Sequence, residues 1–60
     1  MAREYDLEGM ARAIREIIAA AEELKKASAG VPALERNAEA ILVFAHIAGD
    51  NLPDAPAPSP

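Results

Sequence analysis

The sequence contains no cysteine and no tryptophan, and it has one histidine, one tyrosine and one phenylalanine. Without cysteine, the chain forms no disulfide and offers no thiolate ligand to a metal. A single histidine also excludes a histidine-rich zinc site within one chain. Very small domains are usually supported by disulfides, a metal or oligomerisation. The composition therefore leaves oligomerisation as the common means of support.

A long hydrophobic run is also missing. The longest apolar stretch is AILVFAHIA, residues 40–48, whereas a helix needs about 20 apolar residues to span a bilayer. The first residues include Arg3, Glu4, Asp6 and Glu8 with no apolar run after them, which does not fit a secretory signal. We therefore expect a cytoplasmic protein without a membrane segment.

Basic residues are few, and the net charge is −4. Arg36 is the only basic residue in the second half of the chain. Nucleic acids and anionic membranes are bound through clustered lysine and arginine, so we predict neither kind of partner. The sequence also has no glycine-rich phosphate loop and no nucleophile motif. We predict no enzymatic activity, no catalytic residue, no cofactor and no metal site.

The first helix is predicted to run from about residue 6 to residue 29. Asp6 is a suitable N-cap, because its carboxylate can accept hydrogen bonds from the free N–H groups of the first turn. Gly30 ends the helix, since glycine adopts the left-handed conformation common at this position. Pro32 cannot continue the first helix but suits the first turn of a second one.

The second helix is predicted to run from about residue 32 to residue 48, with Gly49 and Pro53 marking its end. The turn at residues 30–31 is so short that the two helices must be antiparallel neighbours. The fold class is therefore all-α, a two-helix hairpin over residues 1–52. Residues 53–60 are rich in proline and alanine, and we expect them to form a disordered tail.

Apolar residues at alternating spacings of three and four define one face of each predicted helix. These two faces are expected to pack against each other as the hairpin core. The predicted core residues are Leu7, Met10, Ile14, Ala21 and Leu24 in the first helix, and Leu34, Ala38, Ile41 and Ala45 in the second.

The second helix has more apolar residues than one partner helix can cover. A separate apolar stripe on its other side predicts contact with another chain, because a large exposed apolar patch marks an interaction site. The simplest arrangement is a homodimeric four-helix bundle, in which changing Phe44 or Val43 to Glu would leave a monomer or an unfolded chain. The predicted interface residues are Ala40, Val43, Phe44 and Ile47, with Ile17 and Ile18 from the first helix.

Three functions remain open at this point. The chain is a small self-associating interaction module, or a regulatory subunit or inhibitor that docks on a larger protein. The third hypothesis is a ligand- or metal-binding bundle that uses His46. Glu39 and His46 are seven residues apart, about 10 Å along a helix, so they cannot share a metal within one helix. We therefore prefer a histidine at the edge of the apolar face, hydrogen-bonded to a carboxylate or to water.

Overall fold

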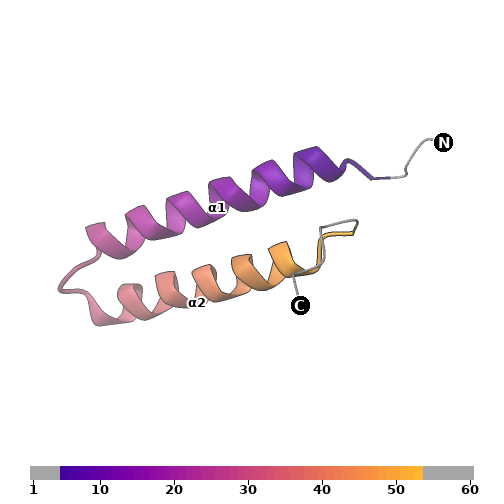
Figure 1. Ribbon diagram of the computed structural model, residues 1–60. Coiled ribbons are helices and arrows are strands. Elements are labelled where there is room, and N and C mark those ends of the chain that lie inside the picture. The colour runs from indigo at the N-terminus through magenta and orange to yellow at the C-terminus, as the bar shows by residue number, and fades with distance from the viewer. Residues whose placement is uncertain (1–4, 54–60) are drawn as a thin grey trace, which may run out of the picture.

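The computed structural model describes residues 5–53 of the 60-residue chain. The described part consists of two α-helices, α1 (Leu7–Ala27) and α2 (Pro32–Asp50), which pack against each other as an antiparallel hairpin (Figure 1). The predicted all-α hairpin is confirmed. Residues 54–60, most of the expected tail, lie outside the described residues. Neither helix combines the length and the apolar character needed to cross a membrane.

Helix α1 begins where its capping residue predicts. Asp6 has an extended backbone, and its carboxylate accepts a hydrogen bond from the Gly9 N–H at 2.9 Å. A Cβ on Gly9 would collide with this carboxylate. Gly9 therefore leaves room for the cap, although glycine lowers the intrinsic stability of a helix.

Helix α1 ends at Ala27, two residues earlier than predicted, because the Ala29 N–H donates to the Lys26 carbonyl three residues back, at 3.3 Å, and leaves the helical pattern. The Ser28 N–H still donates to the Leu24 carbonyl at 2.9 Å, and the Ser28 hydroxyl donates to the Lys25 carbonyl at 3.2 Å. Ser28 is buried beside the turn, with 4% of its surface exposed. The chain then reverses at Gly30, whose φ of 91° is the left-handed conformation that favours glycine.

Helix α2 starts at Pro32, as predicted, with Val31 as its N-cap. Its end differs from the prediction, since the helix continues through Gly49 to Asp50. Among the described glycines only Gly30 has a positive φ, so Gly49 does not act as a C-terminal stop. Asn51 ends the helix instead, and its N–H donates to the carbonyls of Ile47 and Ala48 at 3.1 Å each.

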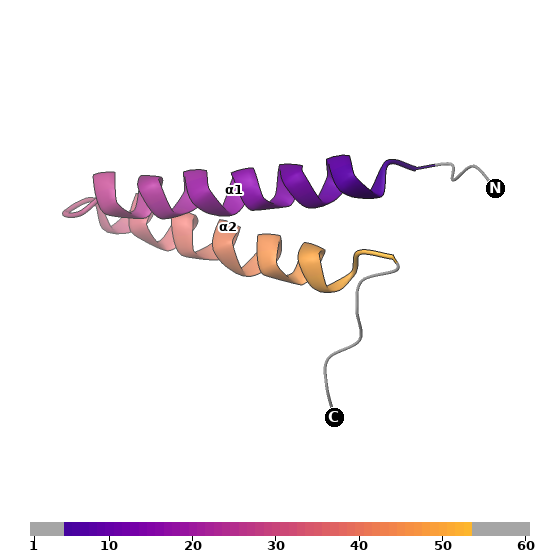
Figure 2. The same ribbon diagram turned by 45° about the horizontal axis from the view of Figure 1, so that its top comes forward.

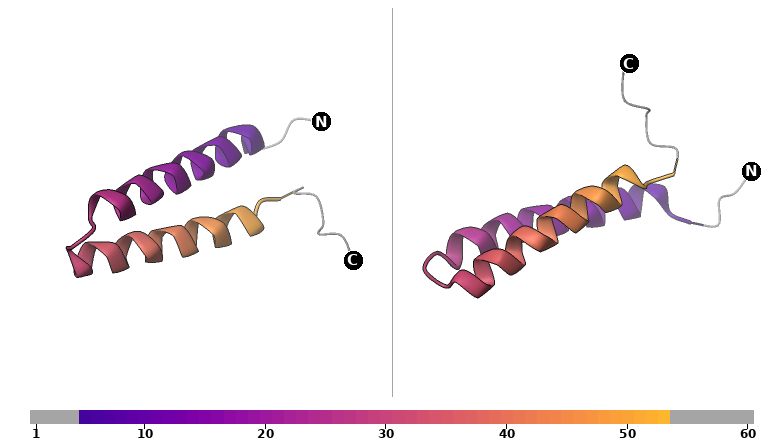
Figure 3. Two further views of the ribbon diagram at one scale, coloured as in Figure 1. Left: turned by 60° about the vertical axis from the view of Figure 1, so that its left-hand side comes forward. Right: turned by 90° about the horizontal axis from the view of Figure 1, so that it is seen from below.

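The two helices run side by side along their whole length (Figures 1 and 2). The start of α1 and the end of α2 lie at the end of the hairpin opposite the turn, and the helix axes cross at a shallow angle when seen from below (Figure 3). The structure has one layer of two helices, so each helix has a partner on one side only.

Candidate interaction surface

The contact between the helices is made mainly by small side chains. Ala21, Ala38 and Ala45 are the buried hydrophobic residues, with 3%, 0% and 6% of their surface exposed. None of the larger side chains in the described residues is fully buried. Alanine at these positions lets the helix backbones approach closely, but each methyl group removes little apolar area from water.

The predicted core is therefore only partly the core of the hairpin. Ala21, Ala38 and Ala45 are buried, and Leu7, Met10 and Ile14 are half-buried. By contrast, Leu24, Leu34 and Ile41 are 36%, 43% and 40% exposed. In the single hairpin these three side chains are therefore not part of the buried core.

Each helix is rotated about its own axis relative to the expectation. In α1 Ile18 is half-buried, while its neighbour Ile17 is 47% exposed. In α2 Leu42 is half-buried, while its neighbour Ile41 is exposed. Ile18 and Leu42 are apolar members of the same wide faces, so their spacing alone did not distinguish them from Ile17 and Ile41.

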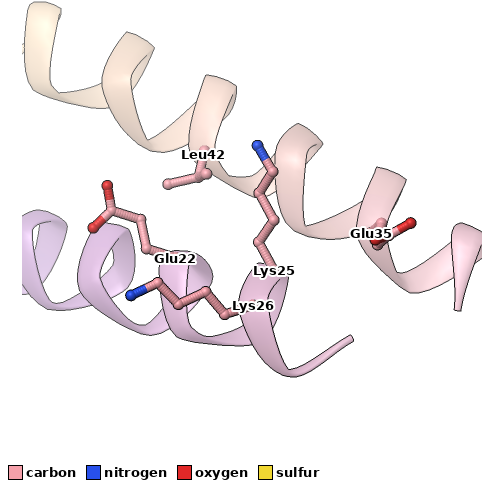
Figure 4. Close-up of a pocket in the computed structure, with 5 residues that line it drawn as sticks. All are labelled: Glu22, Lys25, Lys26, Glu35 and Leu42. Carbon is pink, nitrogen blue, oxygen red and sulfur yellow. The ribbon is translucent and has the colours of Figure 1, made fainter. Parts of the chain in front are cut away.

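One side of the hairpin is charged. Lys25 Nζ lies 3.0 Å from Glu39 Oε2, which joins α1 to α2 across the surface. A shallow open hollow lies on the same side, and its lining consists of Glu22, Lys25, Lys26, Glu35 and Leu42 (Figure 4). The hollow contains carboxylates and ammonium groups in equal number, so it has no strong preference for a charged ligand of either sign.

The opposite side of α1 follows from its helical geometry. At about 100° per residue, Lys25 lies roughly 40° from Ala21 in one direction around the axis. Ile17 and Leu24 lie roughly 40° and 60° from Ala21 in the other direction. The side chains of Ile17 and Leu24 are therefore turned away from the charged side.

Helix α2 repeats this arrangement. Glu39 lies roughly 100° from Ala38 in one direction, and Leu34 and Ile41 lie roughly 40° and 60° from it in the other. Since the Lys25–Glu39 contact places those two charged groups on one side, Leu34 and Ile41 share the other side with the apolar residues of α1.

We call this second side the uncharged face. It contains no ionisable side chain, and large apolar residues alternate on it with alanines. Its members are Met10, Ala13, Ile17, Ala20, Leu24 and Ala27 of α1, and Leu34, Asn37, Ile41 and Ala48 of α2.

A further apolar surface lies on the part of α2 that points away from α1. We call it the outward stripe, and it consists of Ala40, Val43, Phe44 and Ile47, the residues predicted from the sequence as an interface. All four are exposed, with Val43, Phe44 and Ile47 at 56%, 69% and 46%. Phe44 borders the uncharged face, so the two surfaces are continuous around α2.

The sequence also predicted two residues of α1 in the same interface. Of these, Ile17 lies on the uncharged face, and Ile18 turns toward the hairpin contact.

His46 lies on the charged side of α2 and is exposed. Among residues 5–53, no three histidine or acidic side chains gather in a way that could hold a metal ion.

Comparison of the chain with protein-family models, curated proteins and solved structures gives no significant match.

Proposed function

We propose that the chain is a small non-enzymatic helical module that self-associates, most simply as a homodimeric four-helix bundle. One observation carries the proposal. The hairpin buries three alanines and one serine, while most of its large apolar side chains stay at least one-third exposed. The exposed large apolar residues of the two helices are Ile17, Leu24, Leu34, Ile41, Val43, Phe44 and Ile47.

The energetic reason is the small amount of apolar surface that one hairpin removes from water. Complete burial of a Val, Leu, Ile or Phe side chain stabilises a fold by about 1.5–3 kcal/mol. A side chain left half-exposed contributes about half of that, so each residue covered by a partner adds about 1 kcal/mol. For a chain this short, such additions decide whether the folded state is populated.

The test is the mass of the protein in solution and the concentration dependence of its melting. We expect twice the mass of one chain by light scattering after gel filtration. We also expect a melting temperature that rises with protein concentration, because association stabilises the folded chain by mass action. A monomer that melts cooperatively at a temperature independent of concentration would contradict the proposal.

A second candidate function is docking on a larger protein as a regulatory subunit or inhibitor. The exposure of Phe44, 69%, favours it, because an aromatic side chain on an apolar stripe is a common anchor at protein interfaces. The two candidates differ in the state of the isolated chain. A stable homodimer supports self-association, and a molten or aggregating isolated chain supports docking on another protein.

A further inference from the structure

We propose that a second copy of this chain covers the uncharged face, and that the outward stripe remains free in the dimer. This inference rests on the self-association proposed above and specifies which surface mediates it. It differs from the interface expected from the sequence, which consisted of Ala40, Val43, Phe44 and Ile47 with Ile17 and Ile18 from the first helix.

The most apolar side of each helix differs in direction from the side that contacts the other helix. In α1 the apolar residues at heptad spacing are centred between Ala21 and Ile17, whereas the half-buried residues Ile14 and Ile18 extend the contact with α2 on the other side of Ala21. The most apolar side of α1 is therefore turned from α2 toward the uncharged face.

Helix α2 is turned in the same sense. Its apolar residues Leu34 and Ile41 flank Ala38 on the side of the uncharged face, while the contact with α1 is made by Ala38 and Ala45 and extends to the half-buried Leu42 on the other side. In an isolated hairpin the two apolar sides would point at each other. In a four-helix bundle each points toward a central axis between two neighbouring helices. The apolar sides of α1 and α2 converge on the uncharged face, as they would in a four-helix bundle.

The uncharged face can meet a second copy of itself without bringing like charges together. A two-fold dimer brings a surface against its own copy, so an ionisable group near the axis would meet a like charge. The uncharged face has none, whereas the other side of the hairpin carries Glu22, Lys25 and Glu39. Burial of those groups without new partners would be unfavourable.

The uncharged face is large enough to form a specific interface. Helix α1 has 21 residues, so the face is about 30 Å long and, with two helices 8–10 Å apart, about 20 Å wide. Each copy thus offers about 600 Å², and the pair about 1,200 Å², the lower limit of a specific stable interface. Large residues such as Ile17 and Leu24 alternate with small ones such as Ala13 and Ala20, which lets two copies interdigitate.

The outward stripe does not satisfy these conditions. Val43 and Ile47 point roughly opposite to the bundle axis, and the stripe belongs to α2 alone. A dimer formed through it would leave Ile17 and Leu24 of α1 exposed. The outward stripe is therefore the surface that a dimer still offers to a different protein.

Two isoleucines of α2 provide a matched test. Ile41 on the uncharged face and Ile47 on the outward stripe are 40% and 46% exposed in the single chain. We expect Ile41→Glu to raise the dimer dissociation constant about a hundredfold or more, because it places a charge in the interface. We expect Ile47→Glu to change that constant less than about threefold, since position 47 stays in water. Sedimentation equilibrium over a range of concentrations measures both.

The outcomes separate the two proposals. If Ile47→Glu dissociates the dimer as much as Ile41→Glu or more, the assigned face is wrong and self-association stands. If the wild-type chain is a monomer at all concentrations, self-association fails and the assigned face fails with it.

A second measurement decides the matter if Ile41→Glu unfolds. The chain has no cysteine, so Ala20→Cys and Ala40→Cys each introduce a single thiol at an exposed alanine. We expect the thiol at position 20 to react with an uncharged maleimide at least about tenfold more slowly in the dimer than after dilution to monomer, because only the unassociated fraction exposes it. The thiol at position 40 should react at the same rate in both. Equal rates at position 20, or protection at position 40, would overturn the proposal.

Discussion

Lys25 Nζ lies 3.0 Å from Glu39 Oε2, and this ion pair connects the two helices on the charged side of the hairpin. The side chains are 49% and 59% exposed, so water and salt screen their attraction. The pair lies on the side of the hairpin where charged residues of both helices face solvent. The apolar residues of both helices lie together on the other side.

The ion pair should contribute little to stability. We expect a double-mutant cycle of Lys25→Ala and Glu39→Ala to give a coupling energy below about 1 kcal/mol, decreasing in high salt. Urea unfolding of the four proteins measures it. Lys26→Ala is the control, because Lys26 forms no ion pair with the described residues. A coupling energy above about 2 kcal/mol would show that the pair is more protected from water than this structure indicates.

Ala38 sets the distance between the helices. It has no exposed surface, so a larger side chain must push α1 and α2 apart. We expect Ala38→Leu to lower the free energy of unfolding by about 1–3 kcal/mol through overpacking. Ala19→Leu, at an exposed position of α1, should change it by less than about 0.5 kcal/mol. Equal effects of the two substitutions in denaturant unfolding would mean that the contact at Ala38 is loose.

Substitution by alanine should have different effects on the free energy of unfolding at Gly49 and at Gly9. A Cβ on Gly49 would lie 3.9 Å from Cγ2 of Ile14, an ordinary van der Waals distance. We expect Gly49→Ala to raise the free energy of unfolding by up to about 1 kcal/mol, because alanine favours the helix and restricts the unfolded chain. Gly9→Ala should bring no such gain, because its Cβ would displace the Asp6 carboxylate from the cap. Thermal unfolding of both variants tests this, and a clear gain from Gly9→Ala would show that the cap adjusts without loss.

Gly30 is needed for its backbone conformation. Nothing lies within 4 Å of a Cβ built on it, but its φ is +91°. We expect Gly30→Ala to lower the free energy of unfolding by about 1 kcal/mol through strain alone, and Gly30→Asn to lower it less, because Asn tolerates the left-handed region. Circular dichroism melts at equal concentration should give the highest melting temperature for glycine at position 30, a lower one for asparagine and the lowest for alanine. Alanine as stable as glycine would mean that the turn adopts another conformation without loss.

The local signals of the sequence predicted the helices and the turn well. Asp6 caps α1, Gly30 reverses the chain, and Pro32 opens α2. These features depend on contacts within a few residues, such as the 2.9 Å hydrogen bond from the Gly9 N–H to the Asp6 carboxylate. The exact helix ends were less accurate, because Ser28 and Gly49 are compatible with more than one backbone conformation.

The patterns in the sequence predict an antiparallel helical hairpin with more apolar surface than it can bury. The rotation of each helix could not be predicted in this way, and the packing of the hairpin leaves Ile18 and Leu42 half-buried while Ile17 and Ile41 are exposed. The physical reason is that both helices are apolar over a wide arc, so the period of the pattern fits several rotations equally well. Close approach at Ala21, Ala38 and Ala45, together with the charged side chains remaining in water, selected one of them.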